Sequence, residues 1–161
     1  EMAIMSDAFR ALFNTKQKEG ETLQDYTHQF KTAKDVLESH IGGPINLTKY
    51  IKAMDDYNEH DDGVIEKLTK KASEMLISYI YLQNSDPEKY GSIMKGLHDQ
   101  KSLKNNQYPK TMIETTNVLR NHRFDKIKKK SSKNSSNKKN SSNKDTTVNV
   151  CNAREVLVLW K

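Results

Sequence analysis

The residues of this chain that are best suited to chemistry are eight lysines in one short stretch. Residues 126–144 read KIKKKSSKNSSNKKNSSNK and contain no acidic residue. The lysines are Lys126, Lys128, Lys129, Lys130, Lys133, Lys138, Lys139 and Lys144. Lysine binds phosphate as a flexible point charge, and a run of lysines without acids is typical of segments that bind polyanions. The eight lysines are therefore candidate nucleic-acid-binding residues, and the alternative is a solvated linker that binds nothing.

The positive charge of the chain is confined to its C-terminal part. Residues 1–125 hold 17 Lys and Arg against 19 Asp and Glu, a net charge of −2. Residues 126–161 hold 10 against 2, a net charge of +8, which more than accounts for the total of +6. A nearly neutral body followed by a cationic arm predicts a folded module that carries a polyanion-binding segment.

The composition of the basic segment limits what it can recognise. Residues 126–147 contain no aromatic residue that could stack on a base and no arginine for bidentate contact with guanine. Binding through this segment is therefore expected to be independent of nucleic-acid sequence. Each phosphate neutralised on a single strand contributes roughly −0.7 to the slope of log K against log salt, so six to eight lysines predict about −4 to −6. The lysines of residues 126–130 also fit a weak nuclear import pattern.

Residues typical of catalytic or metal sites do not form a recognisable pattern. The five histidines are scattered, at His28, His40, His60, His98 and His122. The acidic cluster at residues 55–62 lacks the alternating ligands and fixed glycine of a calcium loop, so we interpret it as solvated surface. The lone Cys151 excludes an internal disulfide, fits a reducing compartment and is interpreted as an inert thiol. Glycine-rich phosphate loops are absent. We expect no enzyme activity, no metal and no cofactor.

The elements that must carry these residues read as helices. Apolar spacing predicts helices at about residues 2–15, 22–42, 47–54, 64–82, 87–100 and 109–119, and no run alternates long enough for a strand. The expected inward residues are Met5, Phe9, Leu12 and Phe13; Leu23, Tyr26, Phe30, Ala33 and Leu37; Leu47, Tyr50, Ile51 and Met54; Leu68, Ala72, Leu76, Tyr79 and Ile80; Tyr90, Ile93, Met94 and Leu97; and Met112, Ile113, Thr116 and Leu119. The aromatic residues, Tyr81 included, are more typical of a core than of base stacking. The fold class predicted is all-α, a bundle of about five to six helices.

Start and stop signals support these boundaries. Thr22 and Asp25 form a variant of the capping box at the start of the second helix. Gly42 is expected to end that helix in the left-handed conformation. Asp86 is expected to cap the fifth helix, with Pro87 in its first turn.

Composition divides the chain into three parts. Residues 1–125 are expected to form the helical domain, and the Lys/Ser/Asn-rich residues 126–147 are too polar to fold and are predicted to be disordered. Residues 148–161 end in a short apolar run without an assigned role. No stretch is long and apolar enough for a membrane span, and no signal peptide is visible, so we expect a cytoplasmic protein without a membrane partner, with the nucleus as the alternative. A start at Glu1 rather than Met suggests a fragment.

Three stretches together resemble a known family. The first, residues 12–34, contains an acidic turn followed by Thr22-Leu23-Gln24-Asp25-Tyr26 and then Phe30. The second, residues 79–103, reads as a helix rich in leucine and tyrosine, a Ser-Asp-Pro turn and another helix. The third, residues 108–119, looks like a closing helix. In this order and spacing the stretches resemble the Gag polyprotein of copia-class LTR retrotransposons over about residues 1–125.

The resemblance implies a capsid-like helical module that associates with itself into particle shells around RNA and is not an enzyme. Such Gags commonly continue into a zinc knuckle of three cysteines and one histidine. This sequence offers only Cys151, so a knuckle cannot form, and we expect a degenerate copy that is truncated or frameshifted after the basic linker. The alternative is a domesticated or host nucleic-acid-associated helical module that does not assemble.

Overall fold

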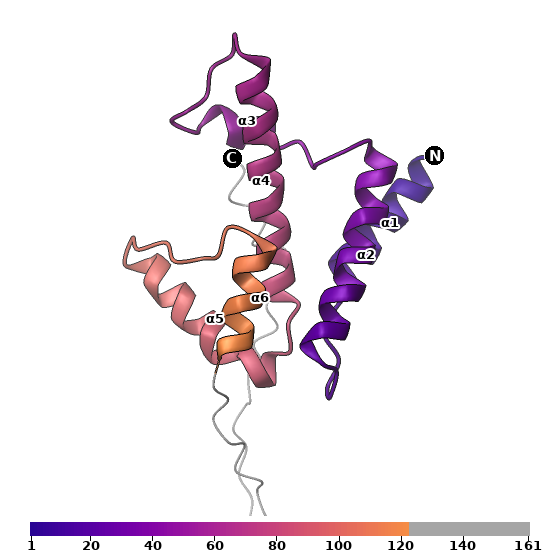
Figure 1. The fold of residues 1–161 in the computed structure, drawn as a ribbon, viewed down its shortest axis with the longest axis vertical. Helices are drawn as coiled ribbons and strands as arrows, with labels where there is room; N and C mark the ends of the chain where they lie inside the picture. The colour runs from indigo at the N-terminus through magenta and orange to yellow at the C-terminus, as the bar shows by residue number, and fades with distance from the viewer. Residues whose placement is uncertain (123–161) are drawn as a thin grey trace, which may run out of the picture. The chain divides into compact units, whose positions relative to one another are not determined.

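The structure, a computed structural model, describes residues 1–122 (Figure 1). Six helices and no strand lie in this range: α1 (Met2–Asn14), α2 (Leu23–Ile41), α3 (Thr48–Lys52), α4 (Asp62–Gln83), α5 (Pro87–Ser102) and α6 (Met112–Asn121). The predicted all-α class is confirmed. The basic segment 126–147 and the terminus 148–161 lie outside the described residues, as does the predicted disorder of the first of these.

The helix boundaries follow the capping signals of the sequence. The Thr22 hydroxyl accepts a hydrogen bond from the Asp25 amide at 3.1 Å and donates one to the Asp25 carboxylate at 2.7 Å. Gly42 ends α2 with a φ of 80°, a conformation that glycine adopts without steric cost. Asp86 caps α5 by accepting from the Glu88 amide at 2.9 Å, with Pro87 as the first helical residue. These three predictions are confirmed.

Two helices begin at places that the apolar spacing did not indicate. Helix α4 begins at Asp62, two residues before the predicted start, because Asp61 accepts a hydrogen bond from the Val64 amide at 3.1 Å. Helix α6 begins at Met112 rather than near residue 109. Its cap is Thr111, which accepts from the Glu114 amide at 3.1 Å, while the Glu114 carboxylate accepts from the Lys110 amide at 2.8 Å. Both starts are therefore set by side-chain caps rather than by the apolar stripe.

Helix α1 lies along α2, α3 lies along the first part of α4, and α6 lies along its second part (Figure 1). The centre of the main core is aromatic: the ring centroid of Tyr81 lies 4.9 Å from that of Tyr26 and 5.1 Å from that of Phe30. All three side chains are fully buried. Around them pack the other buried residues of the main core, Ala8, Leu12, Leu37, Ile77, Ile80, Leu82, Tyr90, Met112 and Leu119. A smaller cluster of Ile51, Leu68 and Ala72 joins α3 to the first half of α4.

Three residues predicted to face inward are exposed instead. Phe13 is 46% exposed because α1 buries the line of Ala8 and Leu12, and Phe13 stacks on Phe9 outside it. Ile113 is 71% exposed, since Met112, Thr115 and Leu119 form the buried line of α6. Tyr50 is 41% exposed because the five-residue α3 buries Ile51 in its place. These predictions were wrong where two neighbouring apolar residues competed for one face.

Candidate nucleic-acid interface

All eight candidate lysines of residues 126–144 lie outside the described residues, as does Cys151. The structure describes the surface of the body from which this segment continues after α6. Its described helices include none that is long and apolar enough to cross a membrane. The question for the structure is therefore which charged groups the body itself presents, and where.

The histidines and the acidic cluster do not converge within residues 1–122, where no three His, Cys, Asp or Glu side chains are placed to share a metal ion. In the cluster, Asp61 caps α4, and His60 lies 3.5 Å from the Glu59 carboxylate with both side chains mostly exposed. The His122 ring lies 3.1 Å from the Ser92 hydroxyl. Both residues are far from the acidic cluster in the sequence. The cluster at residues 55–62 thus forms a cap and solvated surface, as interpreted from the sequence.

Four aromatic residues of the described chain are buried in the core. Tyr26, Tyr81 and Tyr90 are buried, as is Phe30, so their rings are not available for stacking on bases. Burial raises the pKa of Tyr26 well above the ordinary value of 10 and also raises the pKa of Tyr90. The core interpretation is confirmed for these four and wrong for Tyr50, whose ring is partly exposed. Recognition of nucleic-acid bases by a stacking platform therefore has little support in the described surface.

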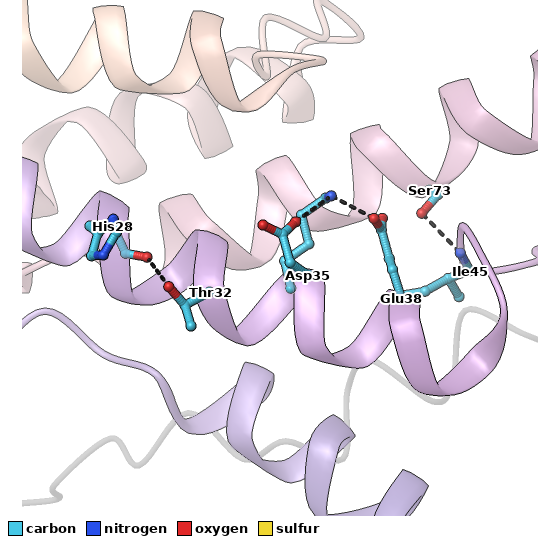
Figure 2. A network of polar contacts seen from close by, with 7 residues as sticks. His28, Thr32, Asp35, Glu38, Ile45 and Ser73 are labelled. Carbon is cyan, nitrogen blue, oxygen red and sulfur yellow. Dashed lines mark hydrogen bonds and ion pairs between the residues drawn. The ribbon is translucent and has the colours of Figure 1, made fainter.

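Hydrogen bonds and ion pairs engage several charges along α2 (Figure 2). The ammonium group of Lys34 lies 2.7 Å from the Glu38 carboxylate and 3.4 Å from that of Asp35. Partial burial lowers the pKa of Lys34, but hydrogen bonding and the charge of Glu38, with a smaller part from Asp35, outweigh it and raise the pKa overall. Figure 2 also shows the Ile45 amide donating to the Ser73 hydroxyl at 3.0 Å, which ties the chain after α2 to α4. Lys34 is thus a neutralised charge of the fold and not a free cation.

A cleft of about 980 Å³ opens between the start of α2, the start of α5 and the end of α6. One wall is the row Gln24, His28 and Lys31 on α2, spaced so that these residues share a helix face. The opposite side carries Thr116 and Arg120, one turn apart on α6. The cleft therefore brings together cationic residues that lie far apart in the sequence.

Sequence reasoning did not find this cleft. No sequence pattern indicated Lys31 or Arg120 as a functional residue. The available signal was weak: Arg120 stands in the last turn of α6, a few residues before the basic segment. A helix pattern predicts which residues share a face but not which faces meet across a fold.

Comparison with known proteins gives no match: no protein-family model, no curated protein and no solved structure is similar to this chain. The function proposed for the chain therefore rests on its charge, its surface and its packing. The features that bear on it are the helical body, the basic segment that follows and the cleft beside the end of α6.

Proposed function

We propose that this chain is a structural, Gag-like protein of a retrotransposon, which associates with itself and holds RNA without sequence preference through its basic segment. The observation that carries the proposal is the uneven distribution of charge: −2 over residues 1–125 and +8 over residues 126–161. A body with little net charge can approach further copies of itself, while a lysine-rich arm attracts a polyanion. The resemblance to copia-class Gag over residues 1–125 supports the same assignment.

The helical body supplies apolar side chains that a self-association surface requires. On α1, Met2 is 75% exposed, Ile4 is 54% exposed and Phe13 is 46% exposed. Within residues 1–122 every buried side-chain nitrogen and oxygen has a hydrogen-bond partner, which supports a body that is stable on its own. RNA would gather many copies along one strand, and contacts between bodies would then be made at high local concentration.

Light scattering of the full chain with and without single-stranded RNA tests this proposal. We expect large assemblies that form with RNA and dissociate at high salt, because the electrostatic contacts are screened. A variant with Ile4→Glu and Phe13→Glu should bind RNA but assemble less, whereas Leu103→Glu, at a 76% exposed position after α5, serves as the control.

A discrete monomer or dimer under both conditions would remove the assembly proposal. Such a chain, if it still bound RNA, would fit a domesticated or host helical module that acts on nucleic acid without forming particles.

A further inference from the structure

We infer that the cleft between α2, α5 and α6 is a second RNA contact, in which Lys31 and Arg120 bind phosphates of a single strand that the basic segment also holds. The inference rests on the proposed RNA binding and extends it from the segment to the folded body. The two cations of the cleft lie on neighbouring helices, Lys31 on α2 and Arg120 on α6.

The charged side chains that line the cleft differ in their partners. Two acids have hydrogen-bond partners, whereas the two cations are available to a ligand. The Glu21 carboxylate accepts a hydrogen bond from the Lys18 amide at 2.8 Å and another from Gln29. Asp25 accepts from the Thr22 hydroxyl. Within residues 1–122, by contrast, neither the side chain of Lys31 nor that of Arg120 has a hydrogen-bond or ion-pair partner. All four residues line the cleft, but only the two acids have hydrogen-bond partners within the fold.

A third cation, Lys89, also lines the cleft. The ammonium group of Lys89 donates to the Glu21 carbonyl oxygen at 3.2 Å and lies 3.6 Å from the Asp86 carboxylate. These contacts fix the start of α5 against the turn before α2. Lys89 thus adds positive potential while its primary contacts are internal, so we assign the ligand contacts to Lys31 and Arg120.

The lining of the cleft favours a phosphate backbone over bases. Tyr90 and Leu119 line it, but they are 3% and 1% exposed, so no broad aromatic face is offered to a base. Besides the cations, the lining offers the polar side chains of Gln24, His28 and Thr116, together with the acids Glu21 and Asp25 and the partly exposed Leu23. Contacts of this kind hold a strand by its phosphates and do not read its sequence.

The position of the cleft in the chain suits a strand shared with the basic segment. Arg120 precedes Lys126 by six residues, a stretch of chain that spans at most about 22 Å when extended. A strand that contacts both the cleft and the segment would therefore be bound by one chain at two covalently linked sites. Linked contacts of this kind raise the effective concentration of one for the other.

The test measures binding of a single-stranded homopolymer RNA to the full chain by fluorescence anisotropy over a range of salt concentrations. The variant K31Q/R120Q should reduce the magnitude of the salt slope by about 1.4, because two phosphates are lost at roughly 0.7 each. Affinity at 0.1 M salt should fall on the order of 10-fold to 25-fold. The charge-conserving variant K31R/R120K should retain the slope.

The matched control is K67Q/K71Q, which removes two exposed charges from one face of α4, away from the cleft lining. Circular dichroism of each variant checks that the helices are kept. If K31Q/R120Q and K67Q/K71Q give the same slope, the cleft is not an RNA contact and the inference is overturned. It is also overturned if K31Q/R120Q loses binding to a poly-glutamate peptide but not to RNA.

Deletion of residues 126–147 separates this inference from the proposal on which it rests. If the deletion leaves the salt slope unchanged while K31Q/R120Q reduces its magnitude, the cleft contact stands and the role of the basic segment fails. If the deletion reduces the magnitude of the slope and K31Q/R120Q does not, the role of the basic segment stands and the cleft contact fails.

Discussion

The helical body and the basic segment use charge in different ways. In the body, charges of both signs are present in nearly equal number, and lysines such as Lys34 and Lys70 lie 2.7 Å from carboxylates on their own helices. Between residues 126 and 144 there are eight lysines and no acid to pair with them. Stability of the body thus depends on buried apolar packing, whereas affinity for a polyanion depends on unpaired charge. The two properties should respond to different changes.

Removing Tyr81 from the core should affect the body most. Its fully buried ring contacts those of Tyr26 and Phe30, so Tyr81→Ala leaves a cavity at the centre of the core. We expect a loss of about 3–5 kcal/mol in the free energy of unfolding, measured by urea denaturation followed by circular dichroism. Tyr50→Ala, at a position 41% exposed, is the control and should change stability by about 0.5 kcal/mol or less. RNA binding should keep its steep salt dependence in this variant. Loss of that dependence with Tyr81→Ala would show that RNA affinity depends on the packing of the body.

Alkaline pH should lower the stability of the unsubstituted body. Burial raises the pKa of Tyr26, Tyr79, Tyr90 and Tyr108, so the folded state keeps phenolic protons that the unfolded chain releases near pH 10. Stability is therefore unaffected by these groups below pH 10 and falls above it, by about 1.4 kcal/mol per pH unit for each tyrosine that remains protonated. Unfolding should be seen as a loss of ellipticity at 222 nm together with tyrosinate absorbance.

The matched variant for this pH effect is Tyr26→Phe, which keeps the ring and removes the hydroxyl that donates to the Tyr81 carbonyl at 2.7 Å. It should flatten the alkaline fall in stability. Tyrosinate absorbance that appears near pH 10 for all seven tyrosines while the helices persist would contradict burial of these rings.

Loss of the Ser78 hydroxyl should have a smaller effect. It lies 2.6 Å from the Thr115 hydroxyl and 3.0 Å from the Pro109 carbonyl oxygen, and so joins α4 to α6 and to the loop before it. Ser78→Ala should cost about 1–3 kcal/mol, because buried polar groups lose a partner. The exposed Ser39→Ala is the control. Equal melting temperatures for the two variants would show that the contact does not stabilise the packing of α6.

The smallest effect is expected at the cap of α2. Thr22→Ala removes the hydroxyl that accepts from the Asp25 amide and should cost about 1 kcal/mol, or roughly 4 °C in melting temperature. Thr22→Ser keeps an equivalent hydroxyl and should restore most of the loss. If Thr22→Ser melts no higher than Thr22→Ala, the cap is not what stabilises the start of the helix.

Sequence patterns predicted the helices well where the buried residues form a single stripe. The stripe on α2 is such a case, and its Tyr26, Phe30 and Leu37 are fully buried. Helix α4 is different, because Tyr81 packs against α2 while Ser78 bonds to α6. Its buried surface therefore extends around the helix, and a single stripe did not indicate Ile77, Tyr81 or Leu82. An apolar stripe predicts one buried face of a helix, whereas a central helix is buried on more than one face.

The candidate interface was predictable only in part. The lysines of residues 126–144 are evident because they are adjacent in the sequence and lack acids. The cleft is not evident, because Lys31 and Arg120 come together only when α2 and α6 pack against a shared core. Whether a charge is paired also depends on the fold: Lys31 and Lys34 lie on the same helix, yet only Lys34 reaches a carboxylate within the part of the chain that the structure describes.

The most direct test of the central claim is the salt dependence of RNA binding before and after deletion of residues 126–147. We expect the full chain to give a slope of about −4 to −6 from the basic segment, with a further contribution of about −1.4 from the cleft. The deleted chain should keep its helical circular dichroism and retain only the small slope of the cleft. An affinity and slope for RNA that survive the deletion unchanged would contradict the assignment of polyanion binding to this segment.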